Sequence, residues 1–306
     1  MRSLLKSLVP AMDFGWNRTR ARCGLRTCHN KLLVRAVPQN RGGIHAGDDW
    51  YCSPDCFAAA MQVPLAGILR TRLTEMPRNP RLSIGLAMLS KGILTEDQLR
   101  EATTQSQWRG EDLETTLLSL GLATEKQIAA ARAAQWGYPV LSQESPSPIV
   151  RADLPLAFLR NFQAVPVHYA PAAKRLVLGF VHRVEPSVLR AVEEIIGCHT
   201  EPCFVTPTEF VDFGGRCAAA DEYEESVLDQ PGTPSHMART LGGFALEVAA
   251  RQANWVACKS WIWVRLTGKR KTADVLFSLM AAPARQTESL AAPSIVASPQ
   301  GIGALG

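Results

Sequence analysis

Two stretches of the sequence repeat each other: SIGLAMLSKGILTEDQLREATTQS at residues 83–106 and DLETTLLSLGLATEKQIAAARAAQ at residues 112–135. Aligned at an offset of 29, they share seven identical positions, and four more positions stay apolar. The apolar positions recur at helical spacing in both copies. This pattern predicts a duplicated helix–turn–helix unit, in which each copy buries one face against the other.

The ends of the helices can be placed from individual residues. In each copy a glycine, Gly92 or Gly121, is positioned to end the first helix in a left-handed conformation. The motif Thr-Glu-x-Gln follows, and it predicts a capping box at the start of the second helix. In that box the glutamine, Gln98 or Gln127, reaches back to the backbone of the capping threonine.

The duplicated pattern closes in AAQWGYPV at residues 133–140, and it resembles the N-terminal domain of the type II secretion and type IV pilus assembly ATPases, the GspE N-terminal domain family. The likeness continues into residues 153–217, so we expect it to cover about 80–217. It implies a helical bundle followed by a small α/β sandwich. It also implies a relation to the version of this domain that binds cyclic di-GMP.

The resemblance does not extend to the ATPase part of these proteins. No Gly-x4-Gly-Lys-Ser/Thr phosphate loop occurs in the sequence, so there is no basis for ATP hydrolysis. We therefore expect a stand-alone copy of the domain without the ATPase part. Arrangements typical of other catalytic sites are also missing, and we expect the chain not to be an enzyme.

The nucleotide site of the resembled family is altered here. Its repeats open with Arg-Leu-Gly and close on glutamine, whereas the present openings read SIG at 83–85 and DLE at 112–114. Both arginines are absent, and Asp112 and Glu114 would repel a dianion. Arg81 and Arg109 precede the two positions by two and three residues, so one of them could reach the nucleotide only if the alignment shifted. By resemblance, the candidate nucleotide-binding residues are Arg81, Gly85, Gly92, Gln98, Arg109, Gly121, Gln127 and Gln135.

Four of the eight cysteines lie near the N-terminus as Cys23-x4-Cys28 and Cys52-x3-Cys56. Two close pairs separated by a loop are typical of four thiolates converging on zinc. Ser53 and the proline that follows it predict a helix start, which places Cys56 in the first helical turn. Zn²⁺ would be structural, because four protein ligands close its coordination sphere. The alternative is four reduced, buried cysteines.

The net charge of +5 is unevenly distributed. Residues 1–81 contain 13 Lys/Arg and five Asp/Glu, and the remainder carries a net charge of −3. A basic head can meet nucleic acid, anionic lipid or an acidic partner. Nucleic-acid binding would use six residues of the head: Arg18, Arg20, Arg22, Arg26, Lys31 and Arg35.

The last third predicts an acidic linker at 218–235, a C-terminal αβ unit at 236–280 and a disordered tail at 281–306. We expect the unit to contain a helix and a hairpin with strands at 256–266 and 272–279. In the first strand Trp261, Trp263 and Arg265 share one face, while Cys258 lies on the other. That face would pack internally or contact a partner, with nucleobase stacking as an alternative.

Together these patterns predict an α+β protein: a zinc-stapled head at 1–66, the secretion-ATPase-like domain at 80–217, the linker, the C-terminal unit and the tail. The expected function is a non-enzymatic adaptor or regulator that contacts components of a secretion or pilus assembly machine, or other proteins with the same domain. The alternatives are a cyclic di-GMP receptor and a zinc-dependent nucleic-acid-binding protein. Without a signal peptide or membrane span, we expect a cytoplasmic protein that reaches the inner membrane through its partners.

Overall fold

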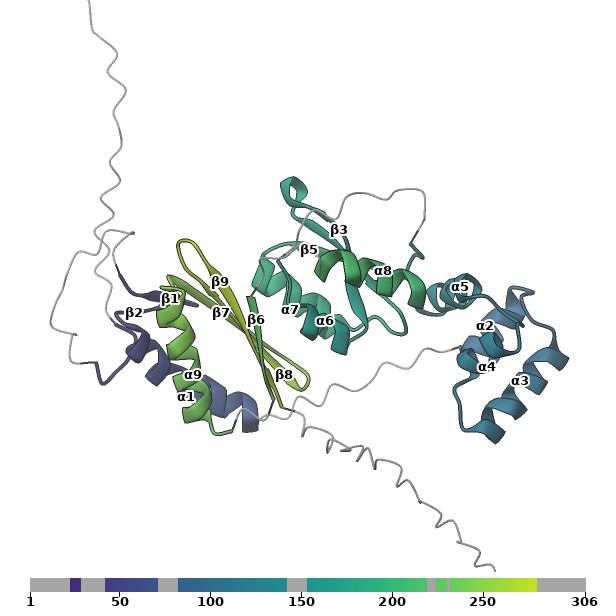
Figure 1. The fold of residues 1–306 in the computed structure, drawn as a ribbon, viewed down its shortest axis with the longest axis horizontal. Coiled ribbons are helices and arrows are strands. Elements are labelled where there is room, and N and C mark those ends of the chain that lie inside the picture. Colours follow the sequence, from purple (N-terminus) through teal and green to yellow (C-terminus); the bar gives the residue numbers. More distant parts are fainter. Residues whose placement is uncertain are drawn as a thin grey trace, which may run out of the picture.

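The computed structural model describes residues 23–28, 42–70, 82–141, 153–218, 224–229 and 232–279 (Figure 1). These residues form an α+β protein, as predicted. The expected tail at 281–306 lies outside this range. Among the helices described, none combines the length and the apolar character needed to cross a membrane.

The largest sheet is built from both ends of the chain. It has six strands in the order β2-β1-β7-β8-β9-β6. A short hairpin from the head forms one edge, and β1 pairs in parallel with β7 through His45 opposite Gln252 and Ala46 opposite Ala253. The strands are β1 (Ile44–Ala46), β2 (Asp49–Tyr51), β6 (Glu224–Asp229), β7 (Gln252–Cys258), β8 (Trp261–Thr267) and β9 (Thr272–Ser278).

Two helices cover one face of this sheet (Figure 1). Helix α1 (Pro54–Arg70) comes from the head and α9 (Pro234–Glu247) from the C-terminal part. The two helices touch closely, because a Cβ on Gly242 would lie 3.0 Å from the Cβ of Ala58. Their shared core is apolar and includes the fully buried side chains of Ile44, Phe57, Met61, Leu65, Leu241, Ile262 and Val264.

The domain boundaries predicted at the two ends of the chain are therefore wrong. The described residues of the head predicted at 1–66 and those of the unit predicted at 236–280 form one domain, because they share a sheet and a core. The expected linker at 218–235 contains β6, which pairs in parallel with β9. Its acidic residues concealed the strand, since charged residues are depleted in strands and mark solvated segments.

The long strand expected at 256–266 is also interrupted. A tight turn at Lys259, where φ is +52°, divides it into β7 and β8, which pair antiparallel with Cys258 opposite Trp261. Directly opposed residues point to the same side of a sheet. Cys258 therefore shares the face of Trp261 and Trp263, contrary to the prediction, and the alternation along β8 itself is confirmed.

The duplicated unit forms four helices: α2 (Ile84–Ser90), α3 (Glu96–Arg109), α4 (Leu113–Ser119) and α5 (Glu125–Trp136). Both predicted capping boxes are present, at Thr95 with Gln98 and at Thr124 with Gln127. Gly92 and Gly121 follow the first helix of each copy with φ of +68° and +65°. The predicted helix starts and helix ends of the repeat are therefore confirmed.

The α/β part follows the repeats and stands on the face of the large sheet opposite α1 and α9 (Figure 1). It has a three-stranded sheet in the order β3-β4-β5, with α6 and α7 in the core shared with the large sheet and α8 over the small core on its other side. Its elements are α6 (Leu156–Asn161), β3 (Ala164–Ala170), η2 (Pro171–Ala173), β4 (Arg175–Phe180), α7 (Pro186–Ile196), β5 (His199–Phe204) and α8 (Pro207–Ala218).

Replacing Phe57 with alanine tests whether the head belongs to the same core as the C-terminal strands. Phe57 is fully buried, and truncating a buried Phe removes apolar contacts and leaves a cavity. We expect Phe57→Ala to lower the free energy of unfolding by about 3–5 kcal/mol. Denaturant unfolding followed by circular dichroism measures the change.

Val63→Ala on the same helix is the matched control, because Val63 is 78% exposed and the change should be nearly neutral. If Phe57→Ala melted only α1 and left the transition of the C-terminal strands unchanged, the shared core would be disproved.

Candidate functional site

The four predicted ligands meet at the end of the head next to α1. Cys23 lies beside Trp50 of β2, and Cys28 closes the turn that follows. Cys52 lies directly after β2, and Cys56 lies in the first turn of α1. The four sulfur atoms lie within 4.8 Å of one another, and no other metal-binding group of this kind occurs in the residues the structure describes.

The spacing of the sulfur atoms fits a tetrahedral ion. The Sγ–Sγ distances are 3.7 Å for Cys28 to Cys52, 3.6 Å for Cys52 to Cys56 and 3.7 Å for Cys56 to Cys28. A Zn–S bond of about 2.3 Å implies tetrahedral edges of about 3.8 Å. A disulfide would require about 2.05 Å, and all four cysteines are free. The cluster can therefore hold a metal ion.

Local hydrogen bonds explain why the two cysteine pairs adopt this geometry. The N–H of Gly24 donates to the carbonyl of Trp50 at 2.8 Å, which fixes the first pair against β2. The N–H of Cys28 donates to the carbonyl of Leu25 at 3.1 Å and closes the turn. At the second pair, Ser53 accepts from the N–H of Cys56 through its hydroxyl at 3.2 Å, as an N-cap does.

Burial makes the charge of the cluster depend on whether a cation is bound. Burial raises the pKa of the Cys56 thiol to about 12, with a smaller lowering by Ser53. Burial also raises the pKa of Cys23, against hydrogen bonds from the backbone of Cys52 and Leu25 that lower it. The thiols of Cys23 and Cys56 are therefore protonated at neutral pH in the absence of metal. A bound divalent ion stabilises the thiolates and releases protons.

The predicted nucleotide-binding residues of the first repeat do not form an open site. A Cβ on Gly85 would lie 2.6 Å from Cδ1 of Leu99, so this glycine serves close packing of α2 on α3. The Gln98 side chain accepts the N–H of Thr95 at 2.9 Å and is engaged in its cap. Arg109 is exposed at the end of α3. Arg81 lies outside the described residues.

The second repeat is similar. The Gln127 side chain accepts the N–H of Thr124 at 2.8 Å. Gln135 donates its amide N–H to the carbonyl of Leu82, which ties the end of α5 to the start of α2. Gly92 and Gly121 serve as helix terminators with open space around them. The polar groups that the resemblance assigned to a ligand thus stabilise the repeats themselves.

A buried ion pair that the sequence did not predict involves the first residues of the second repeat. Arg132 of α5 is 4% exposed, and its guanidinium pairs with the carboxylate of Glu114 and donates to the carbonyl of Val181. Burial lowers the pKa of Arg132 to about 10, so it stays charged at neutral pH. Glu114 occupies the position that Gly85 holds in the first copy. The start of the second repeat therefore already supplies a carboxylate that pairs with the buried guanidinium.

Asp112 and His182 border this pair. Burial raises the pKa of Asp112, but hydrogen bonds from Thr115 and the charges of His182 and Arg132 bring it below its ordinary value. Burial and the nearby guanidinium lower the pKa of His182, so its imidazole is neutral at pH 7. Asp112 caps α4 by accepting the N–H of Thr115 at 2.9 Å. Only pairing between different elements reveals this cluster, and no sequence spacing marks it.

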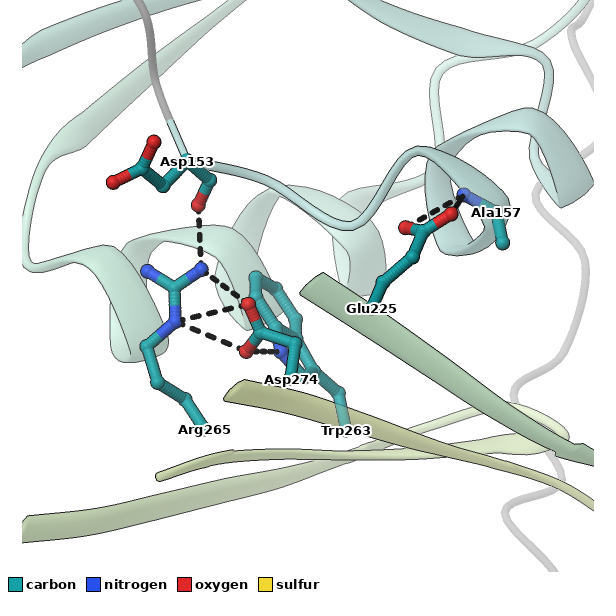
Figure 2. A network of polar contacts seen from close by, with 6 residues as sticks. All are labelled: Asp153, Ala157, Glu225, Trp263, Arg265 and Asp274. Atoms are coloured by element: carbon teal, nitrogen blue, oxygen red, sulfur yellow. Dashed lines mark hydrogen bonds and ion pairs between the residues drawn. The ribbon is translucent and has the colours of Figure 1, made fainter. Parts of the chain in front are cut away.

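The face of β8 that carries Trp261, Trp263 and Arg265 packs inside the chain. Of the two expectations for this face, internal packing is confirmed and contact with a partner is wrong. Trp263 is fully buried, and Trp261 and Arg265 are 7% and 9% exposed. Figure 2 shows Trp263 and Arg265 directed at Asp274 of β9, beneath the start of α6. Of the basic head residues expected to meet nucleic acid, only Arg26 lies in the described part of the chain, and it is exposed.

Comparison with known proteins supports the predicted relationship. The type IV pilus assembly ATPase PilB of Thermus thermophilus is 26% identical over 212 residues, which is 68% of this chain and 23% of PilB. The chain thus spans about a quarter of that relative's length. The matched stretch is longer than 80–217, so the similarity extends beyond the segment that we expected to carry it. No protein-family model matches the chain.

Solved structures give partial superpositions. A structure of MshE with cdg has 23% sequence identity and a TM-score of 0.37, and the match covers 44% of this chain and 99% of that one. A structure of the N-terminal domain of XpsE has 23% identity and a TM-score of 0.34, covering 46% of this chain and 98% of that one. The similarity to PilB in sequence confirms the relation to the assembly ATPases.

Replacing Cys28 with serine tests the metal cluster. Serine does not supply a thiolate, so the variant has three of the four soft ligands, and we expect its metal content to fall from about one ion per chain to almost none. The melting temperature should fall too, because the cluster joins β2 to α1. Elemental analysis of the dialysed protein and a thermal melt measure both effects.

Cys217→Ser provides the control, since Cys217 is a half-buried cysteine remote from the cluster. Equal metal content in Cys28→Ser and Cys217→Ser would rule out a four-cysteine site.

Proposed function

From the relation to the assembly ATPases, we propose that this chain is a non-enzymatic adaptor that binds components of a secretion or pilus assembly machine. The observation that carries the proposal is the match to PilB over 212 residues in a sequence without a phosphate loop. The matched residues can use surfaces through which the corresponding part of such an ATPase contacts other proteins, and this use requires no phosphate loop.

The state of the repeats supports a role in protein contact. Gln98, Gln127 and Gln135 are all engaged in hydrogen bonds within the repeats, and Glu114 neutralises Arg132. What the bundle presents outward is α3, where Ala102 is the one fully buried residue. Trp108 near the end of α3 is 85% exposed, and tryptophan is among the residue types that most often anchor protein interfaces.

We further propose that the ion in the cysteine cluster is zinc. Four thiolate donors at tetrahedral spacing suit Zn²⁺ in a structural site, and there is no open position for a bound water. Its role would be to join the head hairpin to α1. Iron would satisfy the same donors, so identification of the element by mass spectrometry decides between them.

Binding to purified machine components tests the adaptor role. With the metal-loaded chain immobilised, we expect the platform protein or the assembly ATPase from the same bacterium to be retained. Trp108→Ala should weaken this binding by about 30-fold, the effect of losing an interface anchor, without changing the melting temperature. Val63→Ala is the matched control, because Val63 is similarly exposed but lies on α1. Failure of every component to bind would refute the proposal.

Calorimetric titration with cyclic di-GMP separates the adaptor from the alternative of a nucleotide receptor. We expect no heat, because Glu114 already neutralises Arg132 in the second repeat and the caps engage two of the glutamines. Micromolar binding that Arg109→Ala abolishes would instead identify a receptor.

Binding of nucleic acid that falls steeply with salt would favour the basic head as the active surface.

A further inference from the structure

The α/β part and the large sheet meet through an apolar contact centred on Phe158 of α6. Its ring lies 5.4 Å from that of Trp263, tilted by 41°, and 6.4 Å from that of Trp261 in an edge-to-face arrangement. Phe158 and Trp263 are both fully buried. Separating the two parts would expose these rings to water, so the contact favours a docked state.

A buried polar cluster lies next to this contact (Figure 2). Asp274 is completely buried, and it accepts hydrogen bonds from Nε and Nη2 of Arg265 at 3.0 and 2.6 Å and from the indole N–H of Trp263 at 2.5 Å. Burial, and after it the negative charge of Asp153, raise the pKa of the Asp274 carboxyl. The hydrogen bonds donated by Arg265 and Trp263 act in the opposite direction, because such donors stabilise a carboxylate. All three side chains come from β8 and β9, so the sheet assembles the cluster itself.

One bond from this cluster crosses to the α/β part. Nη2 of Arg265 also donates to the backbone carbonyl of Asp153, three residues before α6 begins. The same nitrogen therefore bridges the sheet and the segment that leads into α6, as Figure 2 shows. Asp274 holds the guanidinium through both Nε and Nη2, so the sheet itself sets the orientation of this donor.

Two further polar contacts surround the interface. The carboxylate of Glu225 on β6 accepts the N–H of Ala157 at 3.2 Å, and so it caps α6, whose own N-cap residue Pro155 has no side-chain hydrogen bond (Figure 2). At the β7–β8 turn, Nζ of Lys259 lies 2.6 Å from the carboxylate of Glu185, the N-cap residue of α7. Each contact joins the sheet to a helix N-terminus of the α/β part.

The repeat bundle is in turn tied to the α/β part. Arg132 of α5 donates to the carbonyl of Val181 after β4, and the carboxylate of Glu125 accepts the N–H of Thr208 at 3.2 Å. Ala133 of α5 belongs to the core that α6 and α7 share with the sheet. The position of the bundle therefore follows that of the α/β part.

We propose that Arg265 and Asp274 act as a latch that holds the α/β part on the large sheet, so that the two move as one body and present the repeat bundle in one orientation. Glu225 and Lys259 are positioning residues that support the latch. The proposal is independent of the adaptor role, since it concerns the arrangement of the chain and not its partner.

Hydrogen exchange followed by mass spectrometry tests the latch on the full, metal-loaded chain. Arg265→Lys keeps a positive charge near Asp274 but removes the guanidinium fork that also reaches Asp153. We expect the amides of α6 and of the first turn of α7 to exchange about tenfold faster, the effect of losing one hydrogen bond to a charged group. The amides of α9 should exchange as in the wild type.

Arg175→Lys is the matched control, because Arg175 forms a largely exposed pair with Glu201 within the α/β part. We expect it to leave the exchange of α6 unchanged. Exchange in Arg265→Lys that is unaltered at α6, or that rises equally in α6 and α9, would overturn the latch.

A second variant guards against loss of the fold in Arg265→Lys. Glu225 is only half-buried, and Glu225→Gln retains an acceptor for the Ala157 N–H but loses the charge. We expect a smaller increase in exchange, confined to α6. No change at α6 in this variant, if Arg265→Lys does not fold, would also count against the proposal.

Discussion

The pairing of β1 with β7 is the constraint on which the rest of the structure depends. These two short strands are separated by about two thirds of the chain, yet the N–H of His45 donates to the carbonyl of Arg251 at 2.8 Å and the strands run in parallel. The pairing makes the head and the C-terminal strands one domain. The repeats and the α/β part then form an insertion in this domain: along the chain they follow α1 and precede β6.

The two faces of β8 show how one strand serves both parts. Its alternation directs Ile262 and Val264 to the core under α1 and α9, and directs Trp261 and Trp263 to the α/β part. The four-cysteine cluster adjoins the first of these cores through the hairpin and α1. The buried pair of Arg265 and Asp274 supports the second. The inserted domain therefore packs on one face of the large sheet. The other face is covered by α1 and α9, and α1 begins at the four-cysteine cluster.

Local features were predictable from the sequence and long-range ones were not. The capping boxes at Thr95 and Thr124 depend on residues three positions apart, and the four cysteines depend on close pairs, so short motifs reveal both. The β1–β7 pairing leaves no such mark, because β1 has only three residues and so shows no measurable period. The turn at Lys259 was missed for a related reason: it adopts a positive φ without the glycine or asparagine that signals a hairpin.

The candidate sites follow the same division. Spacing located Cys23, Cys28, Cys52 and Cys56, and the structure brings their sulfur atoms together. Alternation placed Trp263 and Arg265 on one face of β8, but only the three-dimensional arrangement shows that this face is covered. The pairing of Glu114 with Arg132 joins two helices through side chains 18 residues apart, a distance at which sequence alone gives no indication of contact.

Hydrogen exchange of β7 before and after removal of the metal tests the central claim most directly. None of the four cysteines is near β7 in the sequence, and β1 lies between β7 and the hairpin strand β2 that leads to Cys52. We predict that a chelator will increase exchange at the amides of β7 that face β1, together with those of β1 and β2, and that added zinc will restore their protection. If the amides of β1 and β2 lost protection while those of β7 kept theirs, the head and the C-terminal strands would be separate domains.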